Sequence, residues 1–389
     1  MNLKKLFRRT PLAWLQVRRE RTRLLVAALG IAFADILIFF QLGLMAAVFD
    51  AATAIHANLN GDLFLINALS DNMLTIRTFP RTRLFQAGGI EGVESVNSIY
   101  TSVARWRNPD NGTAWQVQIY CFDPANPSLL IPDANIHLNK LKMLNAGIYD
   151  RSARPSLGEV ASKLAKTNYL TAQVNNFQIQ VVGVFTLGAS FSADGNLLVS
   201  DSTFLRLFPD RSSEQIDIGT ILLKPNANIQ QVQTAIRDRL PDDVLVLTKQ
   251  ELINREKNYW GENAPIGIIF GFGTIVGFLV GTIIVYQILY TDVSDHLPEY
   301  ATLKAMGYGD RYLMGVVLQE AIILSFFGFI PGFVISFGLY GLIAQATFLP
   351  VAMTIDRFAL VLFLTLGMCG GSGAIAMGKL QSADPADIF

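Results

Sequence analysis

A segment near the carboxyl end of the chain has the residues of a phosphate-binding loop. Gly373–Lys379 reads GAIAMGK and matches the start of G-x-x-x-x-G-K-[ST], a loop whose backbone amides and lysine cradle nucleotide phosphates. Leu380 stands where the pattern needs a hydroxyl group for magnesium, and the segment ends an apolar run instead of following a strand. We therefore expect no nucleotide binding here and no cofactor on this chain.

The histidine and cysteine residues do not form a metal or catalytic set. His56, His137 and His296 are far apart in the sequence, and none has a second ligand at metal-site spacing. Cys121 lies in polar sequence and Cys369 in an apolar run, so we expect no disulfide between them. A Ser/His/Asp or Cys/His triad cannot be argued from a long polar stretch that contains many such residues by chance. The sequence predicts neither a metal site nor an enzyme.

One carboxylate, Asp35, lies near the middle of a long apolar run. A charged carboxylate in the centre of a membrane helix costs about 2.5–3.5 kcal/mol on insertion scales, so Asp35 should be neutral or paired and should face protein. A structural hydrogen bond or a place at a subunit seam is the simpler interpretation. The alternative, a proton relay, needs a second carboxylate at matching depth, for which Glu320 is the nearest candidate.

The composition assigns most of the apolar residues to membrane helices. Of the 389 residues, 51% are hydrophobic and only 16% are charged, which is atypical of soluble domains. The net charge is zero, so we expect no nucleic-acid partner. A helix needs about 20 apolar residues to cross about 30 Å of hydrocarbon. Four runs qualify, namely Leu24–Val48, Pro265–Tyr290, Leu313–Ala344 and Phe358–Gly378, and Pro331-Gly332 predicts a kink in the third.

The direction of the first run follows from its basic flank. Eight Lys and Arg residues lie between Lys4 and Arg23, and such residues favour the cytosolic side. The run of about 25 residues exceeds the 7–15 of a signal peptide, so we expect an uncleaved anchor and not a cleaved signal. Leu3, Leu6 and Phe7 share one face opposite basic residues, which predicts an amphipathic helix on the inner membrane surface.

These observations predict an α+β membrane protein with four transmembrane helices and a large mixed α/β domain outside the cytoplasm, between the first two; the family resemblance given below implies an inner membrane and a periplasmic domain. Both termini would be cytoplasmic. The expected segments are a cytosolic amphipathic segment at 1–23, the first span at 24–49, the periplasmic domain at 50–263, the second span at 264–290, a cytosolic loop at 291–312, the third span at 313–344, a short periplasmic loop at 345–357, the fourth span at 358–378 and a cytosolic tail at 379–389.

The long insert has the patterns of a folded domain. A strand, an amphipathic helix and a strand are predicted at Ile218–Leu223, Asn228–Leu240 and Val244–Leu247. Two polar stretches, Asn108–Gly112 and Leu187–Asn196, have the composition of hairpin turns, or else contact a substrate or partner. Further strands are indicated by alternating residues at Asp62–Ile66, Val117–Phe122 and Gln178–Phe185.

The loop between the second and third runs predicts a short helix from Pro298. Asp292–Asp310 reads DVSDHLPEYATLKAMGYGD, with Glu299 in the first turn, Lys304 near the end and Gly307 at the position that follows a helix. Tyr300, Leu303 and Met306 would share its apolar face. The helix would be either a connector at the membrane surface or a docking element for a cytosolic protein.

Glycines in the second run form two small-xxx-small rows. Such rows allow close approach of helix backbones in lipid, either within one subunit or across a homodimer axis. Both alternatives remain open. The residues are Gly267, Gly271, Gly273, Gly277 and Gly281.

Three stretches together resemble the MacB/FtsX superfamily of ABC transporter permeases. They are Trp14–Asp35, PEYATLKAMG at Pro298–Gly307 and the closing ADPADIF at Ala383–Phe389. Two further stretches, Val285–Tyr308 and Ser190–Pro209, resemble more narrowly the cyanobacterial DevC branch. The similarity runs through nearly the whole chain.

The resemblance implies a homodimeric, non-catalytic permease in the lipid bilayer. Pro298–Gly307 would be the coupling helix that docks on a separate cytosolic ABC ATPase subunit, which holds ATP and magnesium. The Trp14–Arg23 helix would be a second contact, and the first two spans would be the dimer-forming stalks. By mechanotransmission they would move the periplasmic domain. Exporters of this type work with a periplasmic adaptor, or membrane fusion protein, and a TolC-like outer-membrane channel, and the DevC branch exports glycolipid.

Three functions follow as alternatives. The first is an export permease, and the second is a regulator like FtsX itself, whose outer domain activates a cell-wall hydrolase without transport. The third is a lipoprotein-releasing permease. Because the chain carries no fused nucleotide-binding domain, unlike MacB, the resemblance implies that the ATPase is a partner. A membrane enzyme fits poorly, since no catalytic set is visible.

Overall fold

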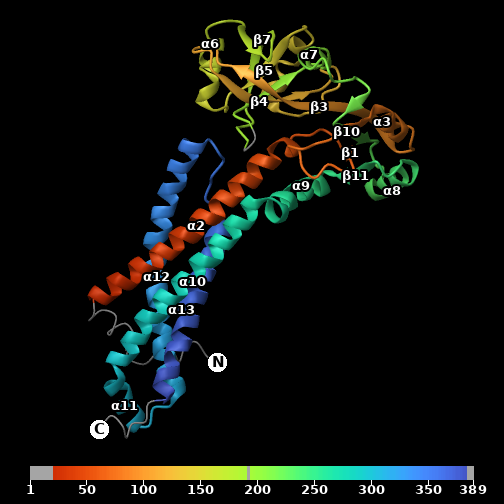
Figure 1. Ribbon diagram of the computed structural model, residues 1–389. Helices are drawn as coiled ribbons and strands as arrows, with labels where there is room; N and C mark the ends of the chain where they lie inside the picture. Colours follow the sequence, from red (N-terminus) through yellow and green to blue (C-terminus); the bar gives the residue numbers. More distant parts are fainter. Residues whose placement is uncertain (1–20, 191–192, 383–389) are drawn as a thin grey trace. The chain divides into compact units, whose positions relative to one another are not determined.

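The computed structural model describes residues 21–190 and 193–382 and divides into two compact units (Figure 1). One unit holds most of the long helices, and the other, Ala47–Gly267 with Ala344–Pro350, is built on a β-sheet. The chain therefore combines four long apolar helices with a mixed α/β sheet domain, as the sequence predicted. The predicted segments at 1–20 and 383–389 lie outside the described residues.

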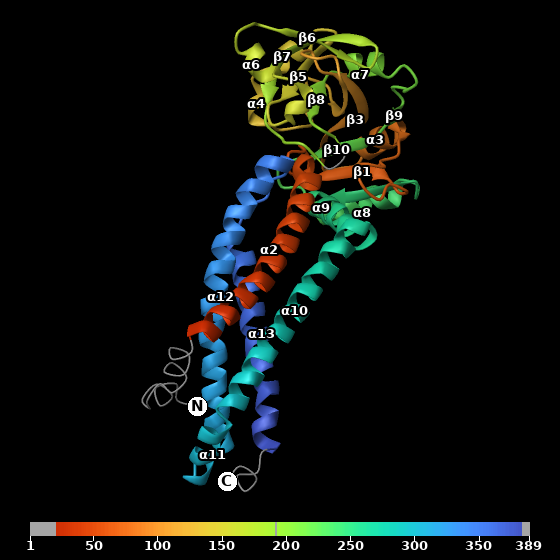
Figure 2. The ribbon, with the colours of Figure 1, turned by 60° about the vertical axis from the view of Figure 1, so that its left-hand side comes forward.

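Four helices in the described chain are long and apolar enough to cross a membrane. Each extends beyond the apolar run that predicted it, because polar turns at the ends continue the helix. Pro331 lies inside the third of them, within a segment that is helical throughout, so the predicted kink there stays a prediction. The four are α2 (Arg21–Ala57), α10 (Pro265–Asp295), α12 (Asp310–Thr347) and α13 (Ile355–Ser382) (Figure 2).

Within the helical unit, α2 contacts the other three long helices. Ile31 of α2 lies against Gly328 of α12, where even a methyl group on the glycine would come within 2.4 Å. Asp35 of α2 is bonded to Thr365 of α13, and α10 approaches α2 along its glycines, as described below. Small residues at these crossings allow the helix backbones to approach closely. Between helices surrounded by lipid such packing takes the place of the hydrophobic effect, because lipid is as apolar as a leucine side chain.

The sheet unit contains a nine-stranded sheet of order β11-β1-β10-β3-β4-β8-β5-β7-β6, and β2 and β9 pair separately. An additional pairing of β3 with β6 closes the strands from β3 to β6 of this order into a ring. The strands are β1 (Leu63–Asn67), β2 (Phe79–Pro80), β3 (Val93–Arg107), β4 (Ala114–Cys121), β5 (Ala146–Asp150), β6 (Leu170–Val174), β7 (Phe177–Phe185), β8 (Asn196–Val199), β9 (Gln215–Ile216), β10 (Ile218–Leu223) and β11 (Val244–Thr248).

The 15-residue strand β3 belongs to both parts of this sheet. Its first half, up to Ile99, pairs with β10, and its second half, from Tyr100, pairs with β4. Trp106 and Arg107 at its end also pair with β6. The open part of the sheet and the ring are therefore joined through one continuous backbone.

Short helices cover this sheet, and their first residues explain where they begin. Thr248 and Glu251 form a reciprocal capping box at the start of α9, and the Asn228 side chain accepts from the Gln231 amide at the start of α8. The helices are α3 (Arg81–Gly88), α4 (Pro132–Asn135), α5 (Leu138–Leu141), α6 (Val160–Leu164), α7 (Asp201–Leu207), α8 (Ile229–Arg239) and α9 (Lys249–Asn258), with a 3₁₀ turn η2 (Pro155–Leu157) and a π-turn η3 (Tyr259–Asn263).

Two apolar clusters lie on opposite faces of the sheet. Leu63 and Leu65 of β1 belong to one cluster, while Phe64 and Ile66 belong to the other. Because successive side chains of a strand point to opposite faces, β1 is buried on both sides and lacks polar alternation.

The local predictions for the sheet unit are confirmed with one exception. Ile218–Leu223, the helix capped by Asn228 and the following strand appear as β10, α8 and β11. Asn108–Gly112 is the hairpin turn between β3 and β4, closed by a bond from the Asn108 amide to the Thr113 carbonyl. A hairpin at Leu187–Asn196 is wrong, because β5 lies between the two strands that this loop connects.

That loop is held instead by one buried carboxylate. Asp150 accepts from the amides of Leu187 and Gly188 and from the side chain of Asn196. The loop from β7 to β8 therefore passes the end of β5, where Asp150, the last residue of that strand, holds it by hydrogen bonds.

Candidate functional site

The predicted loop helix is present as α11 (Leu297–Ala305), with Pro298 in its first turn. Its inner face is fixed by Tyr300, which is fully buried among Val293 of α10, Leu313 and Val317 of α12 and Met377 of α13. Burial of a large aromatic ring against three helices makes α11 an extension of the helical unit and not a loose connector.

The outer face of α11 is open. Glu299 and Thr302 are exposed, and 63% of Met306 is accessible. These positions repeat at helical spacing and form the outer face of α11, defined here as Glu299, Thr302 and Met306. Leu303 is half-buried near Tyr300, whereas Met306, the residue that caps the end of α11, is exposed and does not share that face as the sequence predicted.

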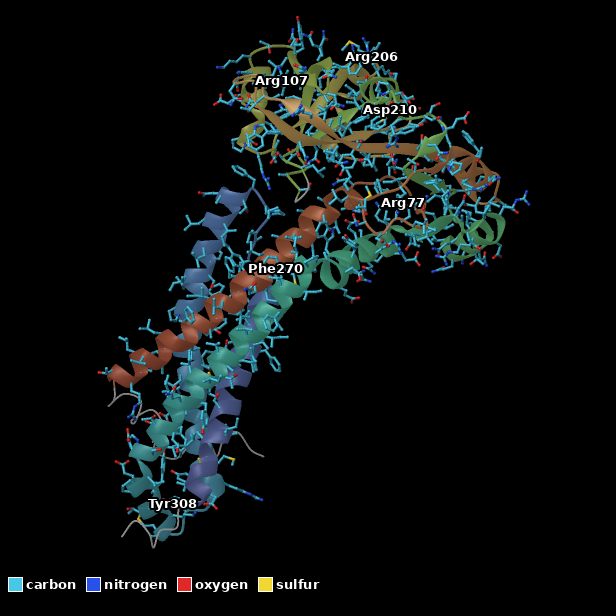
Figure 3. All side chains as sticks on the ribbon, in the orientation of Figure 1. Arg77, Arg107, Arg206, Asp210, Phe270 and Tyr308 are labelled. Carbon is cyan, nitrogen blue, oxygen red and sulfur yellow. The ribbon has the colours of Figure 1, made fainter. Side chains whose placement is uncertain are left out.

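A Schellman motif ends α11. The Gly307 amide bonds to the Lys304 carbonyl and the Tyr308 amide to the Leu303 carbonyl, at 3.0 and 3.1 Å. Gly307 has a φ of +94°, which residues with a side chain rarely adopt. Lys304 then forms an ion pair of 3.2 Å with Asp310 at the start of α12. Tyr308, labelled in Figure 3, lies in the turn between α11 and α12.

Just before α11, an ion pair that sequence patterns did not indicate joins two of the long helices. Arg23 near the start of α2 donates from Nη1 to Asp292 near the end of α10, at 2.8 Å, and from Nη2 to Asp295. Asp292 is almost fully buried. The signals in the sequence were Arg23 in the basic flank of the first apolar run and the acidic residues Asp292 and Asp295 just after the second.

Asp35 is buried between α2, α12 and α13. Its Oδ1 accepts a hydrogen bond of 2.7 Å from Thr365, and Gly332 of α12 approaches its Cβ closely. Its Oδ2 has no hydrogen-bond partner among the described residues. Glu320 is also buried, on α12. The contact with Thr365 supports the structural interpretation of Asp35, and the relay stays a hypothesis.

The five glycines of α10 have three different surroundings. A Cβ at Gly273, Gly277 or Gly281 would meet Gln41, Ile38 or Ala34 of α2, at 2.5, 3.2 and 2.8 Å. Three residues of the row therefore serve packing within the chain, which is the first of the two alternatives.

The other two glycines do not belong to this seam. A Cβ at Gly267 would lie 2.3 Å from the Trp260 carbonyl, so this glycine serves the tight entry from the π-turn. Around Gly271 nothing lies within 4 Å, and this position faces outward among exposed apolar residues such as Phe272 and Ile275.

A buried acidic residue of the sheet unit was missed by the sequence analysis. Glu256 of α9 accepts from the Met73 amide at 2.9 Å and from the Trp260 indole at 2.8 Å, and His56 lies 3.8 Å away. Burial raises the pKa of Glu256 to about 7, against the two hydrogen bonds, which lower it. The spacing of Glu256 and Trp260, four residues apart on a helix, was the signal available.

Residues 264–385 match the family model described as FtsX-like permease C-terminal. This region contains α10, α11, α12 and α13, and therefore the outer face of α11 and the glycine row. The region of similarity to FtsX-like permeases therefore covers the last third of the chain.

Comparison with known proteins gives one relative and several structures. The Pyoverdine export ATP-binding/permease protein PvdT of Pseudomonas syringae pv. tomato is 26% identical over 191 residues, which are 47% of this chain but only 28% of that protein. The periplasmic region of MacB from Actinobacillus actinomycetemcomitans aligns with 52% of this chain and 96% of its own, with a TM-score of 0.36 and 14% identity. The extracellular domain of the noncanonic ABC-type transporter YknZ from Gram-positive bacteria aligns with 48% and 100%, with 0.34 and 14%.

Proposed function

We propose that the chain is the permease subunit of an ABC exporter of the inner membrane. A separate cytosolic ATPase subunit, which binds ATP and magnesium, would dock on the outer face of α11. The four long helices would span the membrane, with both termini in the cytoplasm and the sheet unit in the periplasm. Two features support this proposal: the FtsX-like domain at 264–385 and the export function in the name of the PvdT relative.

The observation that carries the proposal is the division of α11 into two faces. Tyr300 fastens one face to three long helices, while Glu299, Thr302 and Met306 on the other face remain exposed. An exposed methionine beside a carboxylate is a suitable contact for a protein partner, because the thioether adapts to irregular surfaces. A push on this face would act on α10, α12 and α13 together.

Motion would reach the sheet unit by mechanotransmission through α2 and α10. Each of these helices continues from one unit into the other, and they are joined at their cytosolic ends by Arg23 and Asp292. A helix with intact backbone hydrogen bonds transmits axial displacement because its length is fixed at about 1.5 Å per residue.

The transported molecule belongs to the same proposal. The resemblance to the DevC branch supports a lipid-like envelope substrate, a glycolipid, that passes through a periplasmic adaptor and a TolC-like outer-membrane channel. The chain would act as a homodimer. The name of the PvdT relative gives pyoverdine as the molecule that PvdT exports, so pyoverdine is the second substrate to test.

The test begins with isolation of the tagged chain and its co-encoded neighbours in mild detergent. Recovery of a cassette ATPase with a long coiled-coil adaptor supports export. Recovery of a cell-wall hydrolase without an adaptor supports the regulator, and recovery of acylated proteins supports lipoprotein release.

A variant of α11 makes the test specific. Glu299→Ala with Met306→Ala should abolish ATPase recovery and export while the melting temperature stays unchanged, since both side chains are exposed. The matched control is Glu91→Ala with Met143→Ala, which removes an exposed glutamate and an exposed methionine from the sheet unit. Normal ATPase recovery by the α11 variant would contradict the docking proposal.

The direction of the chain can be measured separately. Met306→Cys should react with an impermeant maleimide only when the cytosolic face is open, because the native Cys121 and Cys369 are buried and give little background. Labelling from the periplasmic side would overturn the proposed orientation.

A further inference from the structure

A pocket with a volume of about 460 Å³ opens on the sheet unit between α5, α6 and β7. In Figure 2, α6 and β7 lie next to each other in the ring part of the sheet. The volume is within the range of small-molecule sites, about 300–1,000 Å³.

The floor of the pocket is shaped by a bulge in β7. Gly147 of β5 pairs with Val181 and Ile148 pairs with Gly183, so Val182 is an extra residue. A bulge leaves one residue outside the ladder and turns its groups in a new direction. The Val182 carbonyl accepts a hydrogen bond of 3.2 Å from Nζ of Lys140 in α5.

The imidazole ring of His137 packs directly against Gly183 at the floor of the pocket. A Cβ at Gly183 would lie 2.4 Å from two carbons of the imidazole, so any larger residue would displace the ring. Burial lowers the pKa of His137, and the charge of Lys140 lowers it further, against Asp133. A lowered pKa favours the neutral imidazole, which offers hydrogen bonds without a charge.

The charged groups around the pocket are basic. Lys140 and Arg151 line it with His137, and no acidic residue is among the described residues that line it. The Arg151 backbone is fixed by a bond from its amide to the Phe185 carbonyl at 2.7 Å, while its side chain is exposed. The lining thus presents two permanent positive charges to one opening.

Apolar side chains also line the pocket, together with the polar Thr167 and Asn168. Ala161, Leu164 and Ala165 follow each other at helical spacing on and just after α6, and Val184 of β7 faces the same space. An ion pair between Lys163 and Asp110 holds α6 on its other side. The pocket therefore combines a basic end with an aliphatic surface.

We propose that this pocket binds an anionic amphiphile, whose carboxylate or phosphate headgroup contacts Lys140 and Arg151. Its short aliphatic part lies against Leu164, Ala165 and Val184. Both headgroups suit these side chains, because lysine and arginine form charge-assisted hydrogen bonds with either anion. The inference is independent of the proposed transport function, since it rests on the lining of the sheet unit alone.

Equilibrium dialysis of the full-length chain in a maltoside detergent tests the proposal. The labelled probes are octanoate and octyl phosphate, with inorganic phosphate and 1-octanol as the corresponding fragments. We expect saturable binding of one or both anionic amphiphiles, and the one that binds identifies the headgroup. Lys140→Gln with Arg151→Gln should weaken this binding by about tenfold or more, since two charge-assisted contacts are lost.

The matched control is Lys142→Gln with Lys166→Gln, two exposed lysines near the pocket but not in its lining. It should bind as the unchanged protein does. A second variant, Ala165→Phe, fills the aliphatic wall without a change of charge and should also abolish binding of the amphiphile. Because Ala165 is exposed, this variant keeps the fold.

Three results would overturn the proposal. One is the absence of saturable binding of both amphiphiles. Another is binding that is equal in the unchanged protein and in the charge variant. The third is inorganic phosphate bound as tightly as octyl phosphate, because the aliphatic wall would then contribute nothing.

Discussion

Arg23 of α2 and Asp292 of α10 are 269 positions apart in the sequence, and their side chains meet at 2.8 Å. The carboxylate is almost fully buried and the guanidinium is about one-quarter exposed. The pair joins the start of α2 to the end of α10, immediately before α11. Any load that enters through α11 therefore meets two helices that are already joined.

A double-mutant cycle at this pair has an expected sign. Arg23→Met leaves the buried Asp292 carboxylate without its main partner and should destabilise the protein by about 1–3 kcal/mol. Adding Asp292→Leu should restore part of that loss, because removal of both charges leaves nothing buried and unpaired. Thermal melting in detergent measures both. A double variant less stable than Arg23→Met would show that the pair matters through packing and not charge.

The two faces of α11 should respond differently to truncation. Tyr300→Ala removes a fully buried ring and should cost about 3–5 kcal/mol of stability. Met306→Ala changes an exposed side chain and should stay within about 0.5 kcal/mol. Melting temperatures of the two variants provide the comparison. Equal losses would mean that Met306 is covered in the folded protein.

Substitution of the glycines in α10 should distinguish the glycines that pack against α2 from the glycine that faces outward. Leu at Gly273 and Gly277 should cost about 1–3 kcal/mol by overpacking, since Gln41 and Ile38 already occupy the space. The matched variant Gly271→Leu meets nothing within 4 Å and should leave the melting temperature unchanged.

The same variants test the proposed homodimer. The folded fraction of the double variant Gly273→Leu with Gly277→Leu should still be recovered as a dimer in detergent, because both glycines contact α2 of the same chain. A selective loss of dimer in Gly271→Leu, with normal melting, would place the homodimer contact on the outward face of α10.

Glu256 predicts a pH dependence of stability in the sheet unit. Its pKa is about 7 in the folded protein against 4.5 as the ordinary value, so the folded state binds the proton more tightly. The resulting stabilisation is complete below about 4.5 and is lost as the pH rises through about 7; its size is on the order of 3 kcal/mol.

The measurement compares melting against pH for the unchanged protein and for Glu256→Gln. Burial also raises the pKa values of Asp150 and Asp217, but these groups contribute equally to both profiles, so the difference between the profiles reports Glu256. His56, 3.8 Å from the Glu256 carboxyl group, faces a neutral amide in the variant. Parallel profiles would rule out a protonated Glu256.

The long helices and α11 could be predicted because their signals are local. Apolar length gives the former, and Pro298 and Gly307 mark the two ends of the latter. The partners of Asp35 and Arg23 could not be predicted, since Thr365 and Asp292 reach them only after the helices pack. The hairpin expected at Leu187–Asn196 failed for the same reason: turn composition does not reveal that β5 separates the connected strands.

The pairing of β3 has a consequence for how the sheet unit can deform. A slip of this strand by one residue would turn all its side chains to the opposite face along both halves at once. Tyr100 and Trp106 would then leave the apolar cluster that they share. The open part of the sheet and the ring should accordingly exchange their amide hydrogens as a single cooperative block, so a pull on one edge rotates the whole block instead of unzipping it.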